Sequence, residues 1–211
     1  MSIRKKVLIL TLTLTILWTN GVTMADTEYD FLLQSISKDK KIAPDVIEDL
    51  MDNIAKWESD FKSKSDIKPK SKQVGGGPGR GAFQFELMDQ GGSGRNKSAK
   101  TRLNNYYKML KRERPEWLKN LPDNFDASTL PLEQQKMLFL GDARMGPGNL
   151  SHLVYGKQLG DEPMSVGEWW GKHHKITGVS DKDIEEFNKR AEINRLKTVK
   201  PINTSTATVL N

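Results

Sequence analysis

Apolar residues recur at spacings of three and four between positions 42 and 61, which predicts an amphipathic helix with one buried face. That face is formed by Ile42, Val46, Ile47, Leu50, Met51 and Ile54. Pro44 and Asp45 suit the start of the helix, because a proline needs no N–H partner there and an acid meets the positive end of the helix dipole. Extending the face reaches Trp57, Glu58 and Phe61, so the pattern places a glutamate at the C-terminal end of a core helix.

Glu58 stands between two aromatic residues in this pattern, Trp57 and Phe61. Desolvation beside the rings and the negative end of the helix both disfavour an ionised carboxylate, so we expect a pKa above the ordinary value for Glu58. A carboxylic acid that stays protonated near neutral pH can act as a general acid on a glycosidic oxygen. The alternative is a solvated glutamate paired with Lys56 or Lys62.

The segment 73–86 joins a glycine-rich turn to an alternating aromatic stretch. Its glycines allow positive φ and close approach of the backbone to a ligand, and no Gly-Lys-Ser/Thr follows that would indicate a phosphate-binding Walker loop. The alternation predicts that Phe83 and Phe85 enter the core and that Gln84 is exposed, where its amide suits the acetamido group of an N-acetylated sugar. The alternative is a hairpin whose glutamine is merely exposed. Residues 62–72 form a polar insertion between the two segments.

Further helices are expected over residues 97–113 and 132–144, separated by a connector over residues 120–131. The segment 168–175 holds two tryptophans and two histidines. We expect Trp169 and Trp170 to lie mainly in the core, with the histidines near the rim of a cleft. A metal site is not expected, because adjacent residues diverge on a helix and only His152 remains as a third histidine.

Length and composition fit one exported enzyme domain. The chain has 211 residues, 36% of them hydrophobic, no cysteine and a net charge of +6. Residues 1–25 read as a signal peptide with basic residues ahead of the apolar run 7–18, and a retained membrane anchor is the alternative, although the run is shorter than the roughly 20 residues that span a bilayer. Positive charge favours an anionic polymer such as the cell wall. The scattering of basic residues among acids argues against nucleic acid.

The segments WESDF (57–61) and GPGRGAFQFE (77–86) resemble the lysozyme-like superfamily. Lytic transglycosylases, goose-type lysozymes and many phage cell-wall hydrolases in that superfamily share a helix-terminal glutamate, usually followed by serine, and a later element ending in Gln-Phe. The segments EQQKMLFLGDARMGPGNL (133–150) and EWWGKHHK (168–175) are similar to parts of phage-type members.

The resemblance implies an α+β, predominantly helical domain over residues 26–196, in which a small Gly-rich hairpin forms one wall of a cleft, followed by a flexible polar tail over residues 197–211. It implies cleavage of the β-1,4 bond between N-acetylmuramic acid and N-acetylglucosamine in peptidoglycan, by a lytic transglycosylase or a muramidase. Glu58 is then the catalytic acid, and the residues that contact the glycan are Gln84, Phe83, Gly81, Tyr107 and His173.

Several points stay open within this interpretation. The second carboxylate that a hydrolase needs is not selected by spacing, and the candidates are Asp60, Asp66, Glu86 and Asp89. We expect a monomer that uses no cofactor and no metal, located in the periplasm, in the cell envelope, in a phage particle or released as a lysis protein. Residues 7–18 provide for transient membrane association. The alternative from another class is a non-catalytic wall-binding or virion structural protein with the same fold.

Overall fold

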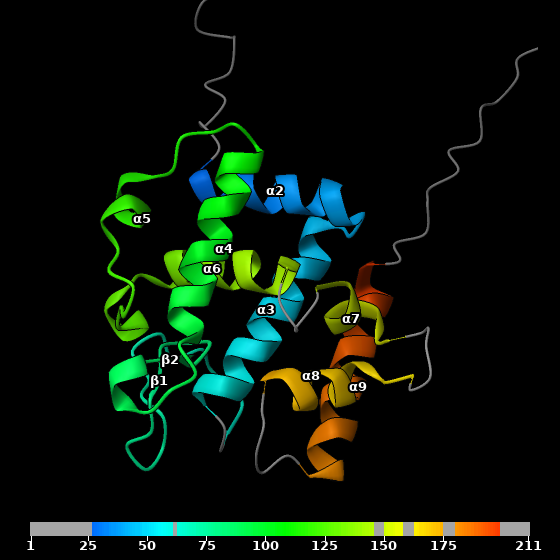
Figure 1. The fold of residues 1–211 in the computed structure, drawn as a ribbon. Helices are drawn as coiled ribbons and strands as arrows, with labels where there is room; N and C mark the ends of the chain where they lie inside the picture. Colours follow the sequence, from blue (N-terminus) through cyan, green and yellow to red (C-terminus); the bar gives the residue numbers. More distant parts are fainter. Residues whose placement is uncertain (1–26, 61–62, 146–149, 158–162, 175–179, 199–211) are drawn as a thin grey trace, which may run out of the picture.

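The computed structural model describes residues 27–60, 63–145, 150–157, 163–174 and 180–198. These residues form a mainly helical domain with one two-stranded antiparallel sheet, which confirms the predicted predominantly helical α+β class (Figure 1). The longer helices are α2 (Glu28–Lys40), α3 (Pro44–Ser59), α4 (Arg95–Met109), α6 (Leu132–Met145) and α9 (Asp181–Thr198). The shorter elements are β1 (Gly79–Arg80), β2 (Phe85–Glu86), α5 (Glu116–Asn120), α7 (Leu150–Tyr155), α8 (Val166–His174) and the 3-10 helices Met88–Gln90 and Ala127–Thr129.

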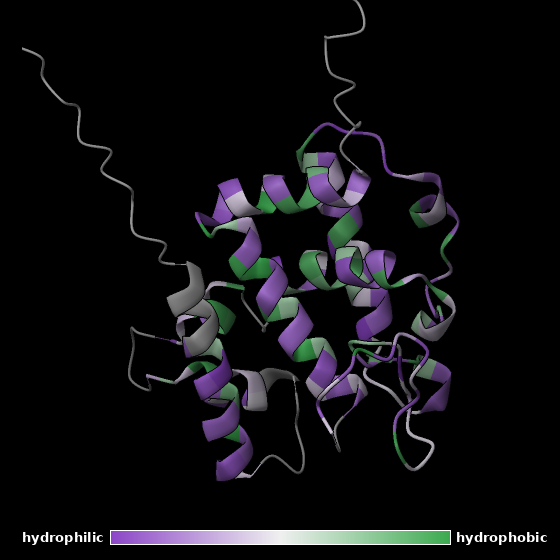
Figure 2. Ribbon diagram, turned by 180° about the vertical axis from the view of Figure 1, so that it is seen from behind, coloured by the Kyte–Doolittle hydropathy of each residue, from purple (hydrophilic) through white to green (hydrophobic). Residues whose placement is uncertain are grey.

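Helix α3 runs through the middle of the molecule (Figure 1). On one side of it lie α2, α4, α5, α6 and the two strands, and on the other side lie α7, α8 and α9. Its predicted apolar face is buried, with Ile47, Met51 and Trp57 each 0% exposed. The hydropathy colouring shows the same alternation of polar and apolar faces along the helices (Figure 2). Burial of both flanks makes α3 the central element of one continuous core.

Helices α4 and α6 pack closely, and Gly141 of α6 allows this short distance between them. A Cβ atom added to Gly141 would lie 2.8 Å from the Cβ of Leu103, a distance that packed carbons do not reach. The sequence predicted both helices, at 97–113 and 132–144, and the structure confirms them with ends shifted by a few residues. The apolar residues Met137, Leu138, Phe139, Leu140 and Ala143 are buried, as expected for a core helix.

Two helices that the sequence reading did not identify complete the domain. Helix α2 begins with a capping box in which the side chains of Thr27 and Asp30 satisfy each other's backbone N–H groups. In the same way, Ser180 and Asp183 exchange hydrogen bonds at the start of α9. Helix α9 continues to Thr198, so the first two residues of the predicted tail are helical.

The predicted export segment 1–25 lies outside the described residues, as does the tail beyond residue 198. Within the described ranges, no helix combines the length and the apolar character that crossing a membrane requires.

Strands β1 and β2 pair through Gly79 with Glu86 and Arg80 with Phe85, and residues 81–84 form the turn between them. The turn is fixed from behind by Gln135 of α6, which is fully buried. Its Oε1 accepts from the backbone N–H of Ala82 at 2.6 Å, and its Nε2 donates to the carbonyls of Pro69 and Leu130 at 3.0 and 2.9 Å. One amide side chain thereby joins the hairpin, the segment before it and the start of α6.

Replacing Gln135 with leucine keeps the volume but leaves one buried N–H and two carbonyls without this partner. Since an unsatisfied buried polar group costs about 1–3 kcal/mol, we expect Gln135→Leu to lower the free energy of unfolding by about 3 kcal/mol or more in urea titrations. Gln134→Leu, at the half-buried neighbouring position, is the control and should cost less than about 1 kcal/mol. Equal losses in the two variants would contradict this role of Gln135.

Candidate active site

Glu58 lies in the last turn of α3, where the sequence predicted it. The residue is half-buried, and its Oε1 atom is shielded from solvent. The end of α3 and the hairpin formed by β1 and β2 lie at the same end of the molecule in the ribbon view (Figure 1). The segment between them is held to both, because the N–H of Lys68 donates to Ser59 Oγ at 2.8 Å and the N–H of Gly81 donates to the carbonyl of Ser71 at 2.8 Å.

Ser59 fastens the returning chain to the end of α3. Its Oγ donates to the carbonyl of Ala55 at 2.6 Å and accepts from the backbone N–H of Lys68 at 2.8 Å. The serine hydroxyl thus bonds back to the carbonyl four residues earlier in its own helix and at the same time holds the next segment in place. The residues after Glu58 are thus arranged by side chains rather than by regular structure.

Asp60 is a nearly buried carboxylate two residues after Glu58. It is 7% exposed, and its Oδ1 accepts from Lys68 Nζ at 2.5 Å, while Oδ2 accepts from the hydroxyls of Ser63 and Ser65. The hydrogen bonds from Lys68 and Ser63 hold the pKa of Asp60 well below its ordinary value. Asp60 is therefore ionised throughout the physiological range, and Ser63, Ser65 and Lys68 of the predicted polar insertion support the end of α3.

Gln84 lies in the turn between the strands rather than in a strand. Its φ is +49°, an uncommon value for a residue other than glycine. The side-chain Nε2 donates to Ser71 Oγ at 2.9 Å and to the carbonyl of Gly81 at 2.8 Å. The amide nitrogen thus closes its own turn, and the half-buried side chain is not the exposed glutamine that the sequence predicted. Phe83 and Phe85 are buried on either side, as the sequence predicted.

Two of the predicted substrate-binding residues belong to the core. Phe83 is 1% exposed and stacks on Phe139 of α6 with ring centroids 4.6 Å apart, which confirms its predicted place in the core, and its glycan contact stays a prediction. Gly81 is buried with φ +76°, and a Cβ atom there would lie 2.4 Å from Gln135 Oε1. Glycine is needed at position 81 because α6 packs against it, not because a ligand approaches.

Tyr107 is also buried in the core. It is 0% exposed and lies beside Glu28 at the start of α2, which crosses the N-terminal rather than the C-terminal end of α3 (Figure 1). Burial, reinforced by the Glu28 carboxylate, raises the pKa of Tyr107 above its ordinary value. His173 lies in the last turn of α8, and its side chain is outside the described residues. Trp170 is fully buried, which confirms its predicted place in the core.

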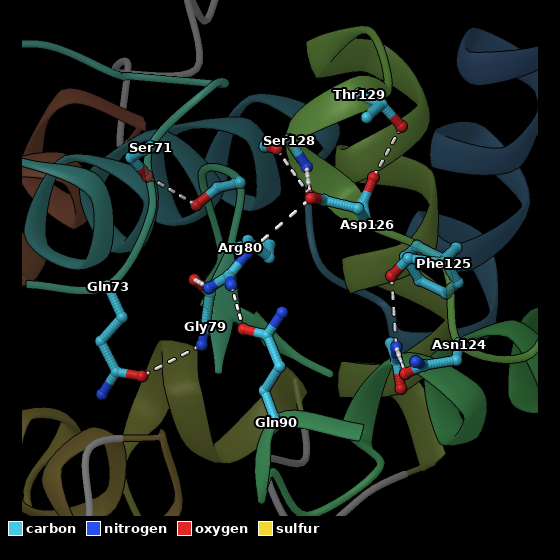
Figure 3. A network of polar contacts seen from close by, with 12 residues as sticks. Ser71, Gln73, Gly79, Arg80, Gln90, Asn124, Phe125, Asp126, Ser128 and Thr129 are labelled. Carbon is cyan, nitrogen blue, oxygen red and sulfur yellow. Dashed lines mark hydrogen bonds and ion pairs between the residues drawn. The ribbon is translucent and has the colours of Figure 1, made fainter. Parts of the chain in front are cut away.

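Arg80 anchors the glycine-rich loop, a role that the sequence did not reveal. It is 7% exposed, and its Nη1 donates to the carbonyls of Gly77 and Gly79 at 2.6 and 2.8 Å. Its remaining nitrogens face Gln90 and Asp126, so the loop is joined to the connector before α6 (Figure 3). The base of the loop is fixed in this way, whereas its tip is open to solvent, with Val74 85% exposed.

A hollow of about 440 Å³ lies elsewhere, between the C-terminal half of α4 and residues 112–119. Its lining includes Asn104, Lys108, Arg114 and Lys119 but none of the residues predicted to bind or cleave a glycan. Several of its charges are already paired, since Lys119 Nζ lies 2.6 Å from Glu113 and Arg112 lies 3.0 Å from Glu28. The hollow is therefore a separate feature from the Glu58 region.

Comparison with known proteins adds no relative: no family model matches the chain, and no curated protein or solved structure does so either.

The positive φ at Gln84 predicts that a glycine variant is more stable than an alanine variant at this position, the reverse of the usual order. Gln84→Ala loses both side-chain hydrogen bonds and keeps a strained φ, whereas Gln84→Gly loses the same bonds but relieves the strain. We expect the alanine variant to be less stable than the glycine variant by about 1 kcal/mol in thermal or urea unfolding. The ordinary order, with alanine the more stable, would show that the turn does not constrain position 84.

The lowered pKa of Asp60 predicts a pH dependence of stability. The unfolded aspartate has a pKa of about 3.9, and the folded group stays ionised below that pH, so Asp60 contributes stability that is fully present above this range. The contribution is lost as the pH falls from about 4 toward the folded pKa. Wild type should thus exceed Asp60→Asn in melting temperature at pH 7, and the gap should narrow at pH 3. A gap that widened in acid would contradict the assignment.

Proposed function

We propose that this protein cleaves the glycan strands of peptidoglycan at the β-1,4 bond between N-acetylmuramic acid and N-acetylglucosamine, with Glu58 as general acid. The observation that carries the proposal is the half-buried Glu58 at the end of a core helix, at the same end of the molecule as the hairpin that bears the glycine-rich loop. The resemblance of WESDF and GPGRGAFQFE to the lysozyme-like superfamily supplies the reaction class. A lysozyme-like cleft between these two elements is part of the proposal.

The proposed chemistry needs one proton donor. Glu58 gives its proton to the glycosidic oxygen as the bond from the muramic acid C1 to that oxygen breaks, and positive charge develops at C1. In a transglycosylase the acetamido oxygen of the same sugar stabilises C1. The C6 hydroxyl then attacks C1, returning its proton to the Glu58 carboxylate and leaving a 1,6-anhydro end. In a muramidase, water attacks instead and a reducing end results.

Two of the four candidates for a second carboxylate, Asp60 and Glu86, are already engaged by neighbouring groups, whereas Asp66 and Asp89 are exposed, so both routes stay open. A hydrolase of the two-carboxylate type needs a second acidic group free to act as nucleophile or base. Asp60 has both oxygens engaged by Lys68, Ser63 and Ser65, and Glu86 accepts from the N–H and hydroxyl of Ser93. In the transglycosylase route the substrate's own acetamide stabilises C1, so Asp60 and Glu86 can keep their hydrogen-bond partners.

Because Phe83, Gly81 and Tyr107 are buried, we propose that the exposed tip of the glycine-rich loop recognises the substrate. Residues 73–76 are exposed, and Gly75 and Gly76 have φ of +80° and +78° with open space around them. Such a backbone can turn its N–H and carbonyl groups toward sugar hydroxyls and acetamido groups. In Figure 1 this loop projects at the same end of the molecule as the C-terminal end of α3.

A wall-binding protein without catalytic activity is the second candidate. The observation that favours it is the engagement of Gln84 in its own turn and the burial of Phe83, Gly81 and Tyr107, which removes side chains expected to orient a glycan for cleavage. The two candidates differ in their products, because only the enzyme releases fragments from purified peptidoglycan.

Glu58→Gln should preserve folding and glycan binding and should lower cleavage by several orders of magnitude, because the amide has the same shape but holds no acidic proton. The measurement is digestion of purified peptidoglycan followed by mass spectrometry, in which 1,6-anhydro ends indicate a transglycosylase and reducing ends a muramidase. Glu86→Gln is the matched control and should retain activity within a few-fold.

More than about a tenth of wild-type activity in Glu58→Gln would mean that another residue is the acid. No product from the wild-type protein, together with retained wall binding, would support the non-catalytic candidate.

A further inference from the structure

Lys64 makes three contacts that join the region after Glu58 to the distant helix α9. Its Nζ lies 3.5 Å from the ring centroid of Trp57, 3.1 Å from Asp183 Oδ1 and 3.1 Å from Glu186 Oε2. The side chain is only 13% exposed, so these contacts are largely shielded from water. The Lys64 ammonium is the foremost cause that holds the pKa of Glu186 below its ordinary value.

The backbone of Lys64 is held as well. Its N–H donates to the carbonyl of Asp60 at 2.6 Å, and its carbonyl accepts from Arg190 Nη1 of α9 at 3.3 Å. Arg190 also donates to Glu186 at 2.7 Å, which orders the carboxylate that Lys64 contacts. The residue has φ +53°, an uncommon conformation for lysine that the surrounding contacts must maintain.

These contacts reach residues on both sides of the proposed acid in the chain. Trp57 precedes Glu58 directly, and its ring is fixed by Trp170 and Phe187 at centroid distances of 5.1 and 5.9 Å. Asp60 follows two residues later and is held by Lys68. A tie between the ring of residue 57 and the carbonyl of residue 60 limits how far the end of α3 can shift, and small shifts of a catalytic group are costly.

We propose that Lys64 is a positioning residue through which α9 fixes the Glu58 end of α3. The inference rests on the proposed function, because it concerns the geometry of that same site. Lys64 does not touch the substrate in this scheme. Loss of the ammonium leaves Asp183 and Glu186 without their shared cation, frees the segment after Asp60 and displaces Glu58 without removing it.

The test compares Lys64→Met with Lys136→Met in the full-length chain. Lys136 is a matched control, because its Nζ lies 2.7 Å from Asp52, its side chain is 14% exposed, and it ties α6 to an earlier turn of α3. With purified peptidoglycan at a temperature well below unfolding, Lys64→Met should lower kcat at least tenfold with KM unchanged within about twofold. Lys136→Met should lower the melting temperature but keep kcat within twofold, and Lys64→Arg should restore at least half of the wild-type kcat.

Two further measurements keep the proposal testable if Lys64→Met folds poorly. Asp183→Asn combined with Glu186→Gln removes the tie from the α9 side and should lower kcat as Lys64→Met does. Amide hydrogen exchange in peptides covering residues 60–68 should become faster in both variants and not in Lys136→Met.

Unchanged exchange, or unchanged kcat in an active protein, would overturn the positioning role. A wild-type protein that does not cleave peptidoglycan would instead overturn the proposed function, and exchange would still decide whether the tie to α9 exists.

Discussion

Burial of polar groups around the end of α3 is the constraint on which the rest of the structure depends. The helix ends at half-buried Ser59 and at Asp60, which is 7% exposed, so these two polar residues need partners within the protein. Ser59 and Lys68 supply them for the returning segment, and Gln135 does so for the hairpin. Asp60 and Arg80 add two nearly buried charges, each with several partners. Loss of any one of these side chains would leave a polar group of a neighbouring residue without its hydrogen-bond partner, so these residues form one connected network.

Aromatic packing joins this network to the two halves of the core. Phe83 of the hairpin stacks on Phe139 of α6, and Trp57 of α3 contacts Trp170 and Phe187 on the other side. Trp170 and Phe187 are themselves stacked at 4.5 Å, so α8 and α9 meet α3 as a pair. The end of α3 is thus joined to α8 and α9 through Trp57, while the hairpin is joined to α6 through Phe83.

The helices that follow from local hydrophobic periodicity could be predicted from the sequence. Contacts between residues far apart in the chain could not. Helices α3, α4 and α6 follow from apolar spacing, and the burial of Phe83 and Phe85 follows from alternation. The capping boxes at Thr27 and Ser180 were readable signals for α2 and α9, although the first apolar face is short and the second is sparse. Periodicity says that Tyr107 is buried but not against which helix. Nor does it reveal that Gln135 reaches a backbone N–H more than fifty residues earlier, because such pairs depend on the finished topology.

The placement of Trp57 changes the physical account of Glu58. The sequence attributed the expected acidity of this glutamate to flanking aromatic rings, of which Phe61 lies outside the described residues. The Trp57 ring is enclosed by Trp170, Phe187 and the Lys64 ammonium, so it belongs to the core and to the contact with α9. Its effect on Glu58 is therefore to fix the backbone from which the carboxyl group projects, while the helix end and the ionised Asp60 form the electrostatic surroundings. The contacts around Trp57 therefore come from α8, α9 and Lys64, whereas the charge nearest in the chain to the proposed acid comes from Asp60.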